Sequence, residues 1–437
     1  MKRYILSMAL GVFAVGSIGS YYASGTEGDA PRYQLVTLEG DAEQAASMRI
    51  SGAYVGGVGS KALQLTVEGT EYDLTQSFYD KYLKDRSYLT RQFEDMREIK
   101  REHRDFMRAR HNVNSFYRDS EWLIYADAAL YGPHSAHDRK LELRLDLLEE
   151  ATGRVTKHRV MLEGKPLNWI QVEDVQRIGD EVHLLARIQL RSDTAAEAAT
   201  EELRDYVVDL RSAVLLRENA LASEKLESMA GTRASGAAQQ TLNEIRLSAI
   251  SSEVRSRPSE YVVLQTLRSV STAEEGGGER TTRLLRHEIY SYSTGTRTPL
   301  PEPPEAYASY PTSQGELGEE RFTMLYSGSE SLALTSFTLS TGTQEPGGWT
   351  LTAEQLGGQA IKSARLAQNR VYALIQTGSS GDQVGIADGR QLAAVVIDAA
   401  NGSVLYKGQA EYAGPAEKAE QFRKNLWLTN IDVKNRQ

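Results

Sequence analysis

The loop at residues 133–138 holds the residue types that most resemble a metal site in this sequence. The imidazoles of His134 and His137 are three positions apart, and the carboxylate of Asp138 is adjacent. Imidazole and carboxylate groups are ligands for zinc and other divalent ions. A third ligand from a distant part of the chain would be needed, and the sequence marks none. We therefore keep His134, His137 and Asp138 as a candidate metal site, with an exposed polar loop as the alternative.

Other motifs for catalysis or cofactor binding are missing. No Gly-x-Ser-x-Gly sequence occurs, and Ser329 lies in the segment SGSES without the context of a nucleophile elbow. Residues 56–61 (GGVGSK) have the glycines of a phosphate loop but not its Gly-Lys-Ser/Thr order, so we expect a tight turn between strands. Glycoside hydrolysis requires a pair of carboxylates across a cleft, and the sequence alone does not identify such a pair among the 59 acidic residues. The sequence predicts no catalytic residue and no cofactor.

The composition is that of a folded chain without sulfur redox chemistry. Hydrophobic residues make up 40% and charged residues 25% of the 437 positions, which is typical of proteins that bury a core. No cysteine is present, which excludes disulfides, thiolate zinc sites, cysteine nucleophiles and a lipid anchor on cysteine. The formal net charge of -9 disfavours a nucleic-acid partner, because phosphate contacts require clustered Lys and Arg.

The first 25 residues predict export from the cytoplasm. Lys2 and Arg3 precede an uncharged, mainly apolar run at residues 4–22, which is the pattern of a secretory signal or a single membrane anchor. Cleavage after Gly25 would release the chain, whereas an uncleaved run would tether it to the cytoplasmic membrane. We expect residues 1–25 to be a signal peptide or membrane anchor and the rest to be extracytoplasmic. Without the +2 of Lys2 and Arg3, the formal charge of -9 becomes -11 for that rest.

The strongest helical pattern spans Ser87 to Arg110. Apolar positions recur every three or four residues between charged ones, which predicts an amphipathic helix packed by its apolar stripe. Residues 80–118 carry 11 basic and 7 acidic side chains. A docking surface for a membrane or an acidic partner is therefore the alternative, which the mixed signs disfavour. With strands expected at 34–38 and 63–67, residues 26–118 form an N-terminal β/α segment. The stripe consists of Leu89, Phe93, Met96, Ile99, His103 and Phe106.

Residues 119–437 read as a repeat of strand pairs. The second strand of each pair leads into a polar turn, and glycine at the turn permits the backbone conformation that sends the next strand back antiparallel. The turn positions are Gly153, Ala213, Gly295, Gly342 and Gly402, which lie 60, 82, 47 and 60 residues apart. The first strands are expected at Trp122–Ala126, Val182–Ile188, Tyr261–Leu264, Phe322–Tyr326 and Val371–Ile375.

Hairpins that recur at about 50–80 residues predict four-stranded units whose faces are buried by their neighbours. The turns Asp146–Val155 and Asp398–Val404 resemble the D-x-x-T-G-x-V turn of bacterial β-propellers related to quinoprotein and YVTN-type repeats. The resemblance covers about residues 118–437. It implies a mainly β, propeller-like domain of five to seven irregular blades, in which the final strand at 425–433 joins the first blade. A large β-sandwich or two separate β domains is the alternative.

Proline and tyrosine usage adds two expectations. Five of the eleven prolines lie between residues 299 and 311, which predicts an extended connector and not a strand. The 22 tyrosines against 8 phenylalanines suit half-buried strands and recognition surfaces, because tyrosine combines an apolar ring with a polar tip.

These features favour a non-enzymatic extracytoplasmic protein, tethered or secreted. It would act as a sensor or adaptor that binds a partner protein or an envelope component, with membrane contact only through an uncleaved N-terminal segment. Two alternatives from other classes stay open: an envelope hydrolase or lyase with an acidic cleft, and a structural subunit of a membrane assembly.

Overall fold

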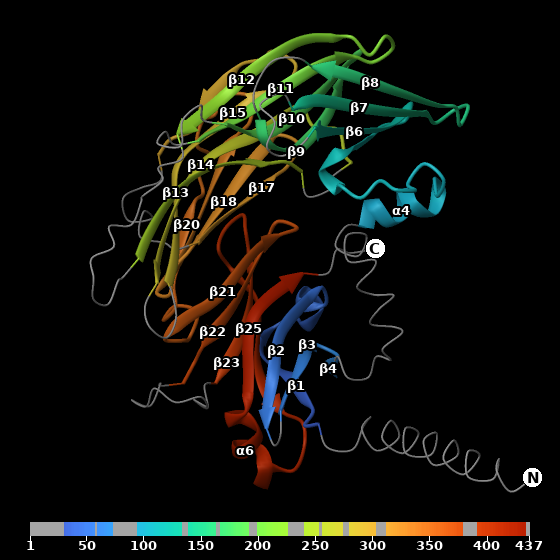
Figure 1. Ribbon diagram of the computed structural model, residues 1–437. Coiled ribbons are helices and arrows are strands. Elements are labelled where there is room, and N and C mark those ends of the chain that lie inside the picture. The colour runs from blue at the N-terminus through green and yellow to red at the C-terminus, as the bar shows by residue number, and fades with distance from the viewer. Residues whose placement is uncertain are drawn as a thin grey trace, which may run out of the picture. The chain divides into compact units, whose positions relative to one another are not determined.

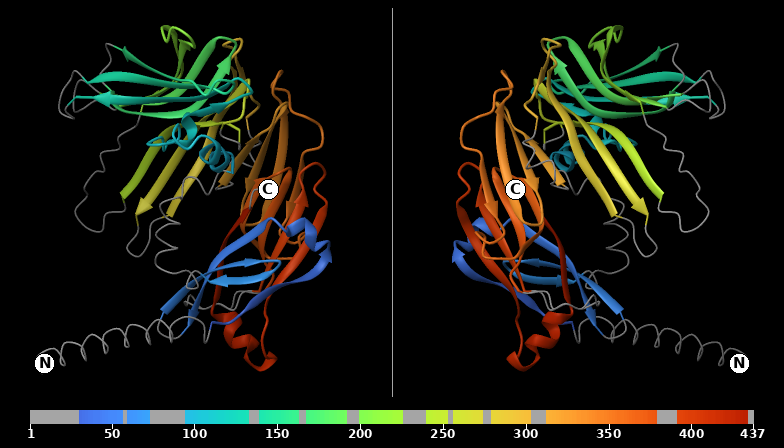
Figure 2. Two further views of the ribbon diagram at one scale, coloured as in Figure 1. Left: turned by 90° about the vertical axis from the view of Figure 1, so that its right-hand side faces the viewer. Right: turned by 90° about the vertical axis from the view of Figure 1, so that its left-hand side faces the viewer.

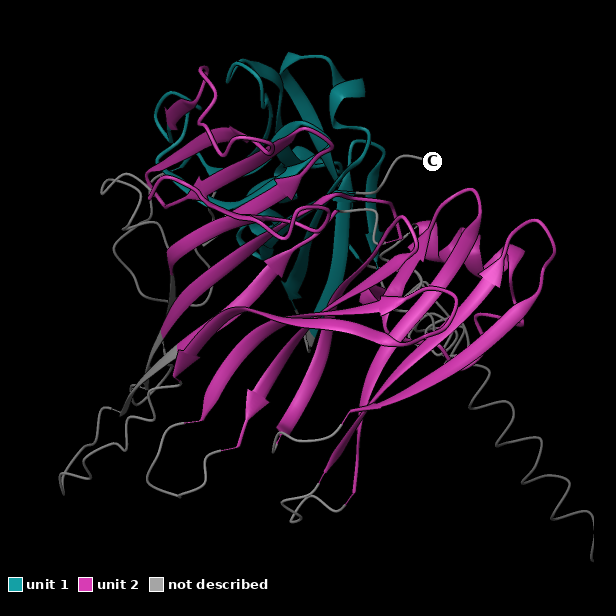
Figure 3. Cartoon of the chain, turned by 90° about the horizontal axis from the view of Figure 1, so that it is seen from above, with its two compact units in different colours: residues 1–86, 352–436 teal, residues 87–351, 437 magenta. Residues whose placement is uncertain are grey.

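The computed structural model (Figure 1) describes residues 30–56, 59–72, 94–132, 139–162, 167–191, 199–225, 240–252, 256–273, 279–302, 312–378 and 391–433. The chain divides into two compact units, which Figure 3 colours separately. The first unit comprises residues 1–86 and 352–436, and the second comprises residues 87–351 and 437. Six antiparallel sheets of four or five strands make up the described part of both units.

The first unit contains two of these sheets. One has the strand order β25-β2-β3-β4 and the other β1-β24-β23-β22-β21. The strands are β1 (Tyr33–Gly40), β2 (Met48–Gly56), β3 (Gly59–Thr66), β4 (Gly69–Tyr72), β21 (Ala360–Ala367), β22 (Arg370–Gln376), β23 (Leu392–Asp398), β24 (Val404–Tyr412) and β25 (Leu426–Val433). Short helices at Ala42–Ala45 (η1), Ala416–Lys418 (η4) and Ala419–Lys424 (α6) connect them.

Segments from both ends of the chain share these two sheets. Strand β1 pairs with β24, with Tyr33 opposite Tyr412. Strand β2 pairs with β25, with Ile50 opposite Ile431. The structure contains the expected final strand as β25, but it pairs with β2, which lies before the first predicted blade at Trp122, and not with that blade. Gly56 at the end of β2 pairs with Gly59 at the start of β3, and residues 57–58 of the expected turn lie outside the described ranges.

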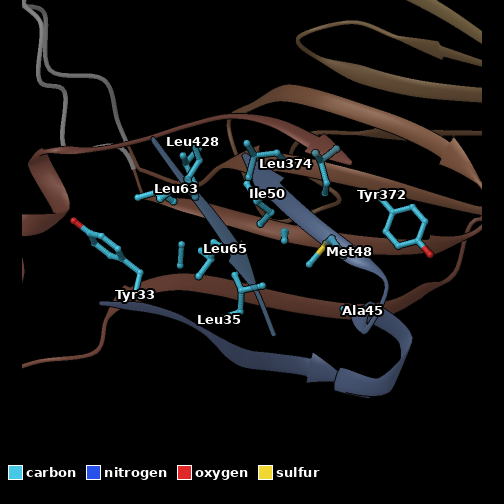
Figure 4. Packing of buried hydrophobic residues seen from close by; sticks show 14 of the residues in the cluster. Tyr33, Leu35, Ala45, Met48, Ile50, Leu63, Leu65, Tyr372, Leu374 and Leu428 are labelled. Atoms are coloured by element: carbon cyan, nitrogen blue, oxygen red, sulfur yellow. The ribbon is translucent and has the colours of Figure 1, made fainter. Parts of the chain in front are cut away.

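The two sheets of the first unit enclose one apolar core (Figure 4). Alternate side chains of a strand face the same side, so Met48 and Ile50 of β2 enter the core together, as does Leu65 of β3. The hydroxyl of Tyr372, on β22, lies 3.1 Å from the hydroxyl of Ser47, so this polar tip is satisfied within the core.

The second unit contains four sheets, each a meander of consecutive strands in chain order (Figures 1 and 2). The first two sheets are β5 (Phe116–Arg118), β6 (Trp122–Tyr131), β7 (Lys140–Glu149), β8 (Val155–Leu162) and β9 (Leu167–Ile178), β10 (Glu181–Leu190), β11 (Thr200–Asp209), β12 (Leu215–Lys225). The other two are β13 (Gln240–Ile250), β14 (Tyr261–Ala273), β15 (Glu279–Ser291), β16 (Arg297–Pro299) and β17 (Thr312–Leu317), β18 (Arg321–Ser327), β19 (Ser331–Thr338), β20 (Trp349–Thr352).

Consecutive sheets of the second unit pack face to face. Leu184 of β10 enters the cluster shared with the β5–β8 sheet, whereas its neighbour Leu185 enters the cluster shared with the β13–β16 sheet. On β14, Val262 and Val263 divide in the same way between the second and the fourth sheet. A sheet that buries both faces needs nearly continuous apolar strands, which explains the unbroken apolar runs in the sequence.

The predicted turn repeat is confirmed in all five positions. Gly153, Ala213, Gly295, Gly342 and Gly402 have φ angles of 68°, 54°, 68°, 69° and 75°. In each turn the amide of this residue donates to the carbonyl four positions earlier, at 2.8 or 2.9 Å. Ala213 adopts this left-handed conformation with a side chain, at a cost of about 1 kcal/mol relative to glycine.

The amphipathic helix is shorter than expected. Helix α4 spans Glu94–Glu102, and its apolar residues Met96 and Ile99 are buried against the β5–β8 sheet together with Phe106. The expected residues before Glu94 lie outside the described ranges. The chain turns after Glu102, where the guanidinium of Arg110 lies 4.1 Å from the Phe106 ring and 2.5 Å from Asp146. These tertiary contacts override the helical periodicity of the last eight residues of the expected helix.

The proline-rich connector begins later than expected. Pro299 is the last residue of β16, which pairs with β15 through Thr298 and Ile289. The expectation of no strand at Pro299 is therefore wrong, because β16 lies at the sheet edge, where proline's missing N–H leaves no ladder bond unmade.

The fold class predicted from the sequence is confirmed: the chain is mainly β and propeller-like, with six antiparallel sheets of four or five strands in its described part. The expected blades were placed within residues 119–437, whereas the sheet β25-β2-β3-β4 takes three of its strands from residues 48–72. The units join segments distant in sequence, whereas the expected domains at 26–118 and 119–437 follow chain order, and those boundaries stay a prediction. The expected leader at 1–25 lies outside the described residues. Over the ranges that are described, no helix is long and apolar enough to span a membrane.

Candidate functional site

The predicted metal residues His134, His137 and Asp138 lie outside the described part of the chain. Within the described ranges, no group of three or more His, Asp or Glu side chains could hold a metal ion. Polar side chains gather instead at two places in the second unit. One lies between the β9–β12 and β13–β16 sheets, and the other lies on the β17–β20 sheet.

The first gathering is a buried polar cluster centred on Asp205, which we call the inter-sheet network. Asp205 is fully buried, and its Oδ2 accepts a hydrogen bond of 2.8 Å from the hydroxyl of Tyr290. Nδ1 of His183 lies 2.9 Å from the same oxygen. Because a carboxylate oxygen accepts, Nδ1 of His183 carries the proton. The network comprises Asp174, Gln176, His183, Asp205, Tyr290 and Tyr292.

The other half of the inter-sheet network is centred on Asp174. The hydroxyl of Tyr292 donates to Asp174 Oδ2 at 2.7 Å, and Gln176 Nε2 donates to the same oxygen at 3.2 Å. Gln176 Oε1 accepts from the backbone amide of Ser259 at 2.8 Å. The Tyr292 ring lies edge-on to His183 at 5.3 Å between centroids, which joins the two halves. Residues from β9, β10 and β11 are thereby linked to residues on and next to β15.

Burial decides what this network can do. Burial, together with the nearby charge of Asp205, raises the pKa of Tyr290, and burial with Asp174 raises that of Tyr292 well above the usual range. Both phenols therefore stay protonated and donate at ordinary pH. Every member is at most 2% exposed, so no substrate reaches the carboxylates. The network is suited to fixing two sheets relative to each other, because buried polar groups stabilise only when paired.

Charged side chains beside the network are also paired. The guanidinium of Arg187 lies 2.9 Å from Glu173 and 3.3 Å from Glu201, and 5.1 Å from the ring of Trp169. Burial raises the pKa of Glu201, although Arg187 opposes this, and Glu201 also accepts from the backbone amide of Leu247 on β13 at 3.1 Å. These charged side chains therefore also connect neighbouring sheets, since Glu201 on β11 accepts from β13.

The second gathering lines a hollow of about 360 Å³, which we call the aromatic hollow. Its aromatic side chains come from three adjacent strands: Tyr326 on β18, Phe337 on β19 and Trp349 on β20. The segment after β16 and the turn between β19 and β20 complete the lining. The described residues that line it are Pro301, Glu302, Tyr326, Leu334, Thr335, Phe337, Gln344, Glu345, Pro346, Gly347, Gly348, Trp349 and Thr350.

Glycine allows the turn at 344–348 to lie against β19. A Cβ on Gly348 would be 3.0 Å from the carbonyl oxygen of Leu334, closer than nine in ten real contacts of this type. The amide of Glu345 donates to the carbonyl of Ser336 at 2.8 Å, which fixes the turn along the strand. The rim of the hollow is therefore held by backbone contacts and does not depend on the side chains that face the hollow.

A buried histidine supports the opposite rim. Nε2 of His287, on β15, donates to the carbonyl of Pro301 at 2.9 Å, and its ring lies edge-on to Phe337 at 5.6 Å. Burial lowers the pKa of His287 below its ordinary value of 6.5, so the ring is neutral at pH 7. His287 therefore connects Pro301 on the rim to the ring of Phe337 in the lining.

Both gatherings contain polar atoms without a hydrogen-bond partner in the described structure, and in the network these are Nε2 of His183 and Oδ1 of Asp205. Glu345 accepts from the Thr338 hydroxyl at 3.2 Å and lies 3.8 Å from Arg321. Glu302 is exposed and has no partner among the described residues. Thr335 is 6% exposed, and its hydroxyl has no hydrogen-bond partner within the described part of the chain. The hollow thus brings carboxylates and aromatic side chains together at one concave surface.

Sequence reasoning predicted neither gathering. His183 lies within the predicted strand Val182–Ile188, but its partner Asp205 is 22 positions away, and Tyr292 is 118 positions from its partner Asp174. The nearest sequence signal was the excess of tyrosine, which supplies Tyr290, Tyr292 and Tyr326. Pro301 belonged to the predicted connector, whose role as a rim depends on the packing of two sheets.

Comparisons with known proteins assign no family. No family model and no curated protein matches the chain. Solved structures with weak likeness include a chain of the S. cerevisiae assembly of Dbp5, Nup159, Gle1, IP6 and ADP (9% identity, 68% of this chain, TM-score 0.27). This chain spans 60% of that one.

Two further structures are similar at the same level. One is the WD40 domain of SCAP from fission yeast (7% identity, 65% of this chain and 74% of that one, TM-score 0.24). The other is the periplasmic gluconolactonase PpgL of Pseudomonas aeruginosa (12% identity, 83% and 95%, TM-score 0.24). Because these TM-scores are below 0.5, the likeness transfers no activity, and what the chain does must be inferred from its own residues.

Proposed function

We propose that this chain is a non-enzymatic binding protein that acts outside the cytoplasm and uses the aromatic hollow to hold its ligand or partner. The proposal is carried by the contrast between the hollow and its surroundings. The carboxylates of the inter-sheet network are at most 2% exposed, whereas Glu302 of the hollow is exposed. Concave sites with aromatic walls and a few polar groups are typical ligand sites.

The location outside the cytoplasm rests on the sequence pattern of the first 25 residues. A basic start followed by an uncharged apolar run is the signature of an exported or anchored chain. The sensor or adaptor role follows from a scaffold of stacked sheets that presents a hollow at one sheet.

The experiment combines location with capture. The full chain with a C-terminal tag is fractionated, and the tagged protein is used to capture partners from detergent-solubilised envelope. We expect the chain in the envelope or medium and a partner that is lost when Trp349→Leu or Glu302→Gln is introduced. Full-length chain in the cytosol, or a partner captured equally by these variants, would contradict the proposal.

An envelope hydrolase is the second candidate, favoured by the two glutamates in the hollow. A carboxylic acid and a carboxylate facing one ligand are the groups that glycoside hydrolysis uses. Hydrolysis of a panel of nitrophenyl glycosides that disappears in both Glu302→Gln and Glu345→Gln would replace binding by catalysis as the function. No turnover by the wild-type chain would reject this candidate.

A further inference from the structure

The charge of the aromatic hollow selects the sign of its ligand. Among the described residues, its lining contains the carboxylates of Glu302 and Glu345 and no Lys, Arg or His. The guanidinium of Arg321 is half exposed and lies 3.8 Å from Glu345, a distance at which an exposed pair contributes little. His287, which contacts Pro301, is neutral at pH 7 because burial lowers its pKa. Concave surfaces lined by one sign of charge concentrate ligands of the opposite sign. The hollow is therefore suited to a cation.

The aromatic side chains select the kind of cation. The rings of Trp349, Tyr326 and Phe337 line the same space, and aromatic faces attract organic cations, tryptophan most strongly. Leu334 and Pro301 add apolar surface for a hydrocarbon stem. A hydrated metal ion would use neither feature, because such ions prefer oxygen ligands in regular geometry. The ligand is an organic cation with a short apolar part.

The carboxylates select a head group that carries N–H donors. The oxygens of Glu302 and Glu345 accept hydrogen bonds, and hydrogen bonds between a cationic donor and a carboxylate are the stronger kind. An alkylammonium or alkylguanidinium ion carries such N–H groups on a cationic head, whereas a quaternary ammonium does not.

We propose that the aromatic hollow binds a primary alkylammonium or alkylguanidinium group, of the kind carried by amines and by lysine and arginine side chains. The head lies between the carboxylates of Glu302 and Glu345, and the stem lies against Trp349 and Phe337. The inference rests on the proposed binding function and specifies the chemistry of the ligand. A volume of about 360 Å³ accepts one such side chain and excludes a folded partner, whose contact would be through a projecting group.

The test is calorimetric titration of the full chain with n-butylammonium chloride at low salt, with n-butanol and sodium butyrate as matched probes. We expect n-butylammonium to bind with a Kd on the order of 1 mM, as its few heavy atoms allow. We expect butanol and butyrate to bind at least about fivefold more weakly, because they lack the cationic head.

Variants separate the hollow from the rest of the surface. Glu302→Gln and Trp349→Leu should each weaken n-butylammonium binding about fivefold, as loss of one charge or one ring contact predicts. Glu330→Gln, an exposed acid on the turn between β18 and β19 outside the lining, should leave binding unchanged. Binding that is absent, or insensitive to Glu302→Gln, overturns the ligand assignment.

The outcome also distinguishes this inference from the proposed function. If butanol or butyrate binds as well as n-butylammonium and binding depends on Trp349, the hollow is a binding site and the cation assignment is wrong. If no probe binds and partner capture is also unaffected by Trp349→Leu, the binding function itself fails.

Discussion

The inter-sheet network and the aromatic hollow contain the same kinds of side chain but differ in what those side chains contact. In the network, the hydroxyls of Tyr290 and Tyr292 donate to buried carboxylates at 2.8 and 2.7 Å. In the hollow, the hydroxyl of Thr335 is equally covered but has no partner in the described structure. The comparison shows that carboxylates closed to solvent stabilise the stacking of sheets, whereas a concave surface with an exposed carboxylate suits binding.

The largest effect is expected for Asp205→Ala in the network. The change leaves the Nδ1–H of His183 and the hydroxyl of Tyr290 without an acceptor in a site closed to water. Breaking a buried charged network should lower the free energy of unfolding by about 3–5 kcal/mol. Urea unfolding measures this.

Asp180→Ala is the matched control for this change. Asp180 is exposed, and its ion pair with Arg211 is long, at 3.8 Å. We expect a loss below about 0.5 kcal/mol. Equal losses for the two variants would show that the network is not a special source of stability.

Two substitutions that remove a hydroxyl should change the free energy of unfolding in opposite directions, and Tyr292→Phe should have the larger effect. It removes the donor to Asp174 and should lower the free energy of unfolding by about 2 kcal/mol, since hydrogen bonds to charged groups are the stronger ones. Tyr131→Phe removes an exposed hydroxyl 3.3 Å from Glu142 and should cost little. A negligible effect of Tyr292→Phe in thermal unfolding would remove the proposed role of this bond.

The second deletion, Thr335→Val in the hollow, should stabilise the protein. Valine keeps the shape of threonine and removes a covered hydroxyl that lacks a partner, for a gain of about 1 kcal/mol. Thr338→Val, on the same strand, removes a hydroxyl that donates to Glu345 and should give no gain. Destabilisation by Thr335→Val would mean that this hydroxyl is already paired.

The smallest effect is a dependence of stability on pH through His287. Burial lowers the pKa of His287 in the folded state, so the unfolded chain takes up a proton first as the pH falls below 6.5. The folded state therefore loses stability below pH 6.5, by at most about 1.4 kcal/mol per pH unit, and the contribution vanishes above that pH.

His287→Gln should remove this component, which is read as the difference between variant and wild type at pH 7.5 and pH 5. His111→Gln is the control, because His111 is exposed. A pH dependence that is unchanged by His287→Gln would mean that burial does not lower the pKa of this ring in the folded state.

The repeat could be predicted from the sequence because each turn depends on residues that are close together in the chain. Each of the five turn positions follows a strand pattern and carries a glycine or, at Ala213, a small residue, and every one has a positive φ. The last strand was predictable in the same way, since Leu426, Leu428 and Ile431 mark an apolar run.

The two polar gatherings could not be predicted because they depend on the stacking of sheets. His183 reads as an interruption of an apolar strand, and only the fold places Asp205 and Tyr290 beside it. The hollow likewise needs the segment after β16 to approach the turn before β20. The helix at Ser87–Arg110 was predicted too long because the ion pair of Arg110 with Asp146 is a tertiary contact.

The most direct test of the central claim follows the indole N–H signals of the full chain by ¹H–¹⁵N NMR during titration with n-butylammonium. The chain has four tryptophans, and only Trp349 lines the aromatic hollow. If the hollow is the binding site, one indole signal shifts, saturates and disappears from the spectrum of Trp349→Leu, and Tyr292→Phe leaves that shift unchanged. Shifts confined to the other tryptophans, or no saturable shift, would contradict the claim that the hollow binds and the network only stabilises.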